Sequence, residues 1–212
     1  SYHAIYKKLN ISNNLTIMGE SFYNKYLNNI VQELSEKGLI IEDDGAKIMF
    51  PIEGKPPLII QKSDGGFGYD TTDLAAIKYR LNNLGANKII YVTDLGQNLH
   101  FQLIFKAAEI AGWAQNKVLE HVGFGVVLGE DGKRIKSRSG ESVKLNDLIQ
   151  EANNKFYNEN YTRLKNGSTQ IDEKNIKGLS EIIGASAIKY ADLRQNRLNN
   201  YHFSYEKMLD HK

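Results

Sequence analysis

Residues 88–94 read KIIYVTD, a nearly continuous run of apolar and β-branched residues with the length of one β-strand. Such a run is typical of a parallel strand that is covered on both faces. A second run, EHVGFGVVLG at 120–129, predicts another buried strand, and apolar residues recur at helical spacing between the two over about 98–111. The order strand, helix, strand predicts a parallel sheet with a right-handed crossover.

The flanking sequence extends this pattern in both directions. Upstream it predicts a helix at 21–37 ending at Gly38, a hairpin turning at Asp44-Gly45, a strand at 58–61 and a helix at about 72–84. Downstream it predicts helices at 145–165 and about 172–196. The fold class expected from this order is α/β, with a doubly wound parallel sheet.

Composition narrows the classes of function. The 212 residues carry 27 lysines and arginines against 25 aspartates and glutamates, a net charge of +2, so a polyanion site would require a local cluster of cations. The absence of cysteine excludes disulfides, thiolate zinc sites and cysteine nucleophiles, and it is compatible with a reducing cytosol. No apolar run approaches the roughly 20 residues of a membrane span, so no membrane partner is expected.

One local cluster of cations does occur. The stretch GEDGKRIKSRSG at 129–140 directly follows the second predicted strand and contains Lys133, Arg134, Lys136 and Arg138. A charged run of this kind is commonly a solvated surface loop. Its place after a buried strand equally suits a basic flap that closes over phosphates.

Three strand-to-helix turns are expected to meet at the carboxyl edge of the sheet, where ligands bind in doubly wound folds. They are GGFGYDTTD at 65–73, DLGQNLH at 94–100, and the basic loop. The first two supply Tyr69, Asp70, Asp73, Asp94, Gln97 and His100. Each of these residues also has a purely structural interpretation, as a helix cap, a first-turn acid or a packing residue.

The residue types at this edge restrict the chemistry. No G-x-S-x-G elbow and no G-x-x-x-x-G-K-[ST] phosphate loop occur in the sequence. What remains is a polar pocket with acids on one side and cations on the other. Such a pocket suits a cationic or zwitterionic metabolite beside a nucleotide phosphate, with catalysis by positioning and charge stabilisation.

Five segments in order resemble the catalytic domain of arginyl-tRNA synthetases, which are class I aminoacyl-tRNA synthetases. They are GESFY (19–23), KSDGGFGYDTTDLAAIKYR (62–80), IIYVTDLGQNLHFQ (89–102), GFGVVLGEDGKRIKSRSGESVKL (123–145) and IKYADLRQNRLNNYHFSYEKML (188–209). The resemblance covers nearly the whole chain and is greatest to the cytosolic eukaryotic form. It implies the second half of a Rossmann-like nucleotide-binding fold.

The resemblance also implies roles for individual residues. The arginine side chain would be bound by Glu20, Tyr69, Asp73 and Gln97. A guanidinium has five donors and no acceptor, so a site made of acceptors suits it. ATP would be bound by Gly96, His100, His121, Gly123, Gly125, Val126 and Val127.

The basic loop resembles the KMSKS signature of class I enzymes in a degenerate form. RIKSRSG at 134–140 replaces KMSKSxG, which places Ser137 where the class has its phosphate-binding lysine. The catalytic cations implied are Lys133, Arg134, Lys136 and Arg138. No protein ligand to a metal is predicted, although Mg²⁺ is expected on the ATP phosphates.

The function implied is arginine–tRNA ligation: ATP activates L-arginine to arginyl-adenylate, and the arginyl group passes to the 3′ end of its tRNA. The resemblance further implies a cytoplasmic location and partners in a synthetase complex. Two alternatives stay open. One is another class I synthetase or a related nucleotidyltransferase, and the other is a non-catalytic RNA- or protein-binding module derived from a synthetase.

The domain organisation expected from the resemblance has three parts. Residues 1–61 form an insertion region with a helix and a hairpin, 62–165 a nucleotide-binding half-domain with the KMSKS-like loop, and 166–212 a helical connection toward an anticodon-binding domain. No HIGH-like motif, which class I enzymes carry on their first strand-to-helix turn, occurs here. The chain is therefore expected to be a fragment that cannot form the adenylate by itself.

Overall fold

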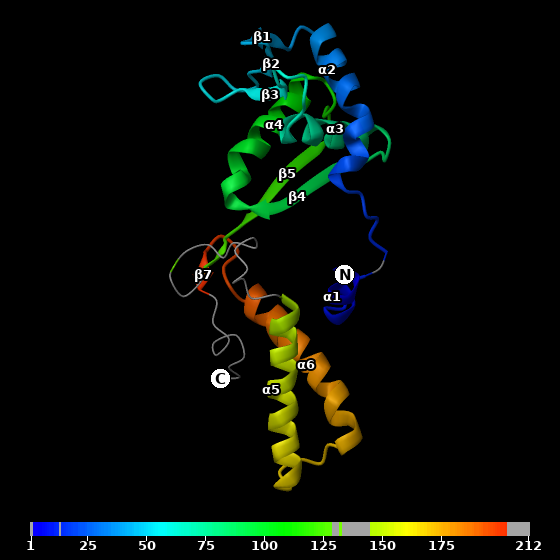
Figure 1. The fold of residues 1–212 in the computed structure, drawn as a ribbon, viewed down its shortest axis with the longest axis vertical. Coiled ribbons are helices and arrows are strands. Elements are labelled where there is room, and N and C mark those ends of the chain that lie inside the picture. The colour runs from blue at the N-terminus through cyan, green and yellow to red at the C-terminus, as the bar shows by residue number, and fades with distance from the viewer. Residues whose placement is uncertain (1, 13, 129–131, 133–144, 203–212) are drawn as a thin grey trace. The chain divides into compact units, whose positions relative to one another are not determined.

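The computed structural model describes residues 2–12, 14–128, 132 and 145–202 (Figure 1). These residues form two compact units. The central unit is the continuous segment Thr16–Phe124, and the terminal unit combines Ser1–Leu15 with Gly125–Lys212. The boundaries of these two units differ from those of the three parts expected from the sequence. The functions assigned to those three parts stay predictions.

The central unit begins with a helical segment that changes its geometry along its length. The 3₁₀-helix η1 spans Glu20–Tyr26 and leads directly into the α-helix α2, Leu27–Glu36. Tyr23 and Tyr26 lie one 3₁₀ turn apart, and both rings pack against Tyr79, at 6.0 and 5.5 Å between centroids. The helix expected at 21–37 is therefore α-helical only from Leu27, and Gly38 follows it with φ +67° as expected.

The hairpin and the short strand after it form an antiparallel sheet in the order β1-β2-β3. The strands are β1 at Ile41–Asp43, β2 at Ala46–Met49 and β3 at Leu58–Gln61. The turn at Asp44-Gly45 has φ angles of 46° and 75°, both in the left-handed region that a two-residue hairpin of this kind requires. The predicted hairpin is confirmed.

The strand–helix–strand order that the sequence predicts is present in the second half of the central unit. Helix α3 spans Tyr69–Asn82, β4 Lys88–Asp94, η2 Leu95–Gln97, α4 Asn98–Ile110 and β5 Val118–Phe124. Strands β4 and β5 pair in parallel (Figure 1). Tyr91 lies opposite His121 in this pair. The bounds of β4 coincide with KIIYVTD.

Only one face of this sheet is covered in the part of the chain that the structure describes. Tyr91 packs against Phe101 and Phe105 of α4, and its hydroxyl accepts a hydrogen bond from Arg80 of α3. On the opposite face Val92 is 63% exposed. The expectation of a strand covered on both faces is therefore wrong for these residues, because α3 and α4 lie on the same side of the sheet.

The second predicted strand is interrupted. Strand β5 ends at Phe124, and Val127–Leu128 form β6, which pairs with β7, Tyr201–His202, in the terminal unit. The Gly125 N–H donates to Arg197 O at 2.8 Å, and the Val126 N–H donates to Asn200 Oδ1 at 2.8 Å. A Cβ on Gly125 would lie 2.1 Å from Asn199 O, so only glycine permits this approach.

The described residues of the terminal unit are mainly helical, with the β6–β7 pair as their strands. It contains α1 at Tyr2–Lys8, α5 at Leu145–Lys165 and α6 at Glu173–Leu193, and the N-cap Asp172 accepts a hydrogen bond from Lys174 N. A small core of Leu148, Ile149, Ala152 and Ile188 joins α5 to α6, and Ile5 and Leu9 pack against it. The bounds of α5 are those predicted, whereas α6 ends three residues before the expected Asn196. No helix among the residues described here is long and apolar enough to cross a membrane.

Within the central unit, Glu33 of α2 joins three other side chains. It forms ion pairs with Lys37, at 2.8 Å, and with Lys78 of α3, and it accepts a hydrogen bond from Trp113 Nε1 at 2.8 Å. Burial alone would raise the pKa of Glu33, but the hydrogen bonds from both lysines and Trp113 lower it to about 2. Glu33 therefore ties α2 to α3 and to the segment after α4.

Candidate active site

The turn at the carboxyl end of β4 is organised around Asp94. Its Oδ1 accepts a hydrogen bond from the Gly96 N–H at 3.0 Å and caps η2, while its Oδ2 accepts one from Gln97 Nε2 at 3.1 Å. A Cβ on Gly96 would lie 2.8 Å from Asp94 Oδ1, so the turn is close-packed at this glycine. The strand end thus positions Gly96 and Gln97, two of the predicted ligand-binding residues.

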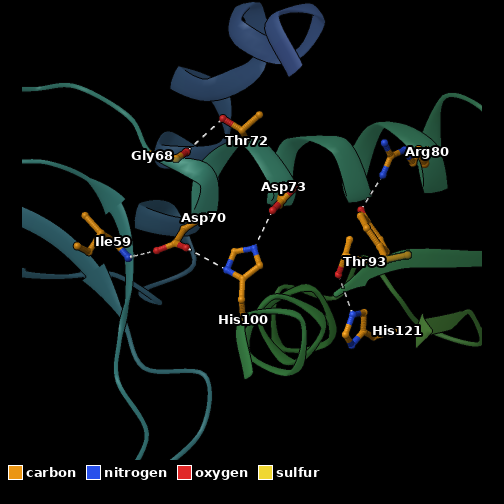
Figure 2. Close-up of polar contacts among 10 residues, drawn as sticks. Ile59, Gly68, Asp70, Thr72, Asp73, Arg80, Thr93, His100 and His121 are labelled. Atoms are coloured by element: carbon orange, nitrogen blue, oxygen red, sulfur yellow. Dashed lines mark hydrogen bonds and ion pairs between the residues drawn. The ribbon is translucent and has the colours of Figure 1, made fainter. Parts of the chain in front are cut away.

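Next to this turn, His100 of α4 lies between two carboxylates of α3 (Figure 2). Its Nε2 is 2.7 Å from Asp73 Oδ2, and its Nδ1 is 3.4 Å from Asp70 Oδ1. The other oxygen of Asp70 accepts a hydrogen bond from the Ile59 N–H of β3 at 2.7 Å. One imidazole therefore connects α4 to α3, and through Asp70 to β3.

The charge of this cluster follows from its geometry. Hydrogen bonds to Asp70 and then Asp73 raise the pKa of His100 to about 9, against the opposing effect of burial. At neutral pH the ring is an imidazolium that donates from both nitrogens. Two carboxylates and one imidazolium leave one net negative charge, which favours a cationic ligand.

A second histidine lies on the covered face of the sheet. His121 of β5 is 2.8 Å from Thr93 Oγ1 through Nε2, and its ring stacks on Phe101 at 4.9 Å between centroids. Gly123 follows it on the same face, where a Cβ would lie 2.6 Å from Leu95 Cδ2. His121 and Gly123, both predicted to bind ATP, are thus neighbours at the end of β5.

The predicted arginine-binding residues are only partly brought together. Asp73 contacts His100, and Gln97 contacts Asp94, at the adjoining ends of α3 and α4. Tyr69, one helical turn before Asp73, is 72% exposed, and Glu20 is exposed at the start of η1. Neither forms a hydrogen bond or ion pair with the other predicted site residues among those described.

Two further sets of predicted residues fall outside the central unit. Gly125, Val126 and Val127 belong to the terminal unit, where their backbone contacts the segment from Arg197 to Tyr201. The loop cations lie outside the described residues; these are Lys133, Arg134, Lys136 and Arg138.

The sequence singled out Asp70 and Asp94 by position without assigning them a role, and it did not indicate the Arg80–Tyr91 pair. Arg80 Nη1 donates to the Tyr91 hydroxyl at 2.7 Å on the covered face of β4. Burial raises the pKa of Tyr91, so its hydroxyl stays neutral. The sequence contains one indication of a role for Arg80: it follows Asp73 by two helical turns, so the two residues lie on the same face of α3.

A parallel strand–helix–strand unit with acids, amides and histidines gathered at its strand ends is the arrangement of a ligand-binding α/β enzyme domain. Residues 1–205 match the family described as tRNA synthetases class I (R), catalytic domain. The chain belongs to this family.

Individual relatives agree with this assignment. The chain is 50% identical over 218 residues to an arginine–tRNA ligase of Nostoc punctiforme and 49% identical over 215 residues to one of Trichodesmium erythraeum. The arginyl-tRNA synthetase structure of Plasmodium falciparum superposes with a TM-score of 0.82 at 39% identity, covering 99% of this chain and 34% of that one. That of Thermus thermophilus has a TM-score of 0.77 at 17% identity, covering 98% and 40%, and shows the shared fold.

The relatives are longer than this chain. The match covers 100% of the chain but 37% of the Nostoc punctiforme protein, and 98% of the chain but 36% of the Trichodesmium erythraeum protein. The chain therefore spans a little over a third of the length of these curated relatives.

Proposed function

We propose that the protein containing this chain is an arginine–tRNA ligase. It would activate L-arginine with ATP to arginyl-adenylate and then transfer the arginyl group to the 3′ end of its tRNA. The observation that carries the proposal is the match of the whole chain, at about 50% identity, to relatives that bear this name. The anionic cluster at the ends of α3 and α4 supports it, because it favours a cationic substrate side chain.

The arginine side chain is assigned to Asp73 and Gln97, with Tyr69 and Glu20 as further acceptors. Asp73 Oδ2 is engaged by His100, and no ion pair within the described part of the chain involves Oδ1, which suits a guanidinium N–H. A hydrogen bond to a charged group contributes roughly 1.5–3 kcal/mol. The lysine ammonium carries the same charge but lacks the planar, forked donors of a guanidinium. These four acceptors therefore favour arginine.

ATP is assigned to the adjoining strand ends, where Gly96, His121 and Gly123 lie. The assignment is supported by their place at the paired carboxyl ends of β4 and β5, where Asp94 lies opposite Phe124, because ligands bind at this edge of parallel sheets. The described residues gather no group of three or more histidines, aspartates or glutamates that could hold a metal. Mg²⁺ is expected on the ATP phosphates, as the family resemblance implies, and no step is assigned to it.

In the proposed reaction, an oxygen of the arginine α-carboxylate attacks the α-phosphorus of ATP, and the bond to pyrophosphate breaks. A hydroxyl of the terminal tRNA adenosine then attacks the arginyl carbonyl, and AMP leaves. The basic loop at 133–138 is proposed to stabilise charge on the departing pyrophosphate, a contribution that rests on its sequence.

The wider biological setting is also part of the proposal. The cytoplasmic location implied by the resemblance stays a prediction, with which the absence of cysteine is compatible. Partners in a synthetase complex stay a prediction. The narrower expectation of a cytosolic eukaryotic type gains no support from the curated relatives named above, which are cyanobacterial.

The test is arginine-dependent exchange of pyrophosphate into ATP by the protein in its full natural length, with arginine-accepting tRNA present and with lysine as the matched control. We expect exchange with arginine and at most a trace with lysine. Equal exchange with both would indicate another class I synthetase. RNA binding with a steep salt dependence but no exchange would indicate a non-catalytic module.

A further inference from the structure

We infer that His100 is a positioning residue that sets the preference for arginine over lysine, by holding the Asp73 carboxylate in one orientation. The inference rests on the proposed function, because it concerns the same substrate. It adds a role for a residue whose ring contacts the proposed arginine-binding acid.

The geometry leaves the ring little freedom. Nε2 contacts Asp73 at 2.7 Å while Nδ1 contacts Asp70 at 3.4 Å, so turning the ring breaks at least one contact. Asp70 is itself held by the Ile59 N–H at 2.7 Å (Figure 2). The edge of the ring also packs against Phe101, at 5.2 Å between centroids. A continuous series of contacts therefore runs from the β3 backbone to Asp73.

The consequence for Asp73 concerns orientation as well as charge. With Oδ2 committed to His100, the direction in which Oδ1 accepts is fixed before the substrate arrives. A guanidinium has rigid, planar donors and gains from an acceptor aimed in advance. An ammonium is a compact charge with rotating donors, so it gains far less from a fixed acceptor direction.

Charge and orientation can be separated with two neutral replacements. In His100→Gln the side-chain amide nitrogen reaches the place of Nε2 and can still donate to Asp73. In His100→Asn it reaches only the place of Nδ1, so it can donate to Asp70 and not to Asp73. Both variants remove the imidazolium charge equally, and only the asparagine variant frees Asp73.

The experiment measures kcat/KM in pyrophosphate exchange with arginine and with lysine, in the presence of arginine-accepting tRNA, for the full-length protein and both variants. We expect the arginine-to-lysine ratio to fall by about tenfold or more in His100→Asn, the size of one lost charged hydrogen bond, and to stay within about threefold of wild type in His100→Gln. KM for ATP is measured in both variants as well, because His100 is also among the residues implied to bind ATP, and a ratio that falls without a matching rise in this KM separates the two roles.

Three results would overturn the inference: unchanged ratios in both variants, equal falls in both, or a fall in His100→Asn accompanied by an equal rise in KM for ATP. If His100→Asn does not fold, Asp70→Asn serves instead. The amide oxygen of the new side chain can still accept from Ile59 N, but the His100 ring no longer faces a carboxylate there. An arginine-to-lysine ratio equal to that of wild type in this variant would overturn the inference. Wild-type protein that does not activate arginine would overturn the proposed function, whereas active wild type with unchanged ratios overturns only the role of His100.

Discussion

Ile89 and Ile90 are neighbours in β4, yet Ile89 is 7% exposed and Ile90 is 51% exposed. Successive side chains of a strand point to opposite faces, and α3 and α4 cover only the face of Ile89. Ile89 is therefore part of the packed core, whereas Ile90 contributes little to the stability of the fold.

Replacing each isoleucine by alanine should reveal this difference. Ile89→Ala should lower the free energy of unfolding by about 2–5 kcal/mol, because it opens a cavity in a packed core. Ile90→Ala should lower it by less than about 1 kcal/mol, as for an exposed position. Urea unfolding followed by the fluorescence of Trp113, the single tryptophan, measures both. Equal losses would mean that the second face of β4 is also covered.

Two glycines of α6 should respond to alanine in opposite directions. At Gly178 a Cβ would meet no described atom within 4 Å beyond its own helix, whereas at Gly184 it would lie 2.2 Å from Asn153 Oδ1 and 3.0 Å from Asn153 N. Gly178→Ala should stabilise the helix by about 0.5–1 kcal/mol, and Gly184→Ala should destabilise the α5–α6 contact. Thermal unfolding followed by circular dichroism compares them, and a stabilising Gly184→Ala would contradict this packing.

The Glu33 cluster predicts a loss of stability in acid. The folded-state pKa of about 2 lies below the ordinary value of 4.5, so the contribution is present above pH 4.5 and is lost as pH falls toward 2. Glu33→Gln should remove this part of the pH dependence and lower stability at pH 7. The unfolding midpoint by Trp113 fluorescence at pH 7 and pH 3 checks it, with the exposed Glu42→Gln as control. An unchanged acid slope in Glu33→Gln would refute the assignment.

The contacts of His100 predict a loss of stability at high pH. Its folded-state pKa of about 9 lies above the ordinary value of 6.5, so its contribution is complete below pH 6.5 and is lost as pH rises through 9. The ring resonances of His100 in an NMR titration should therefore shift near pH 9. Asp70→Asn should bring that midpoint down, because it removes the first of the two carboxylates. A midpoint near 6.5 in the wild type would contradict the observed pairing.

Asp73→Asn tests the arginine site directly. Losing a charged hydrogen bond of about 1.5–3 kcal/mol should raise KM for arginine by roughly 10- to 150-fold, with KM for ATP nearly unchanged. Asp43→Asn, at an exposed position in the β1–β2 hairpin, is the matched control. Weakened binding of both substrates would mean that Asp73 acts through the fold and not through the guanidinium.

Much of the fold could be predicted because local patterns determine it. The bounds of β4 and α5 coincide with the predicted runs, and Asp44-Gly45 turns the hairpin, since each depends on residues close in sequence. The end of β5 at Phe124 was missed because the sequence stays apolar to Leu128. The backbone of Gly125 and Val126 instead bonds to residues more than 70 positions away.

The residue types of the candidate site could be predicted from the sequence, but the contacts between their side chains could not. The turns after strands could be located, so Asp73, Gln97 and His100 were expected at one edge. That His100 contacts Asp73 and Asp70 depends on side-chain directions across 27 and 30 positions of sequence, which periodicity cannot supply. The exposure of one face of β4 could not be predicted either, because KIIYVTD has apolar residues on both faces of the strand.

The assembly of the terminal unit from both ends of the chain has a consequence for biosynthesis. Lys8 Nζ donates to Asn146 Oδ1 at 2.6 Å, a contact between residues 138 positions apart, and Ile5 and Leu9 pack on the same helix. At roughly 5–20 residues per second, a ribosome exposes that partner on the order of ten seconds after α1 has emerged. The continuous segment Thr16–Phe124 can complete its own core in this interval. Helix α1 therefore meets its native neighbours only after the segment Thr16–Phe124, which follows it in the sequence, has been made.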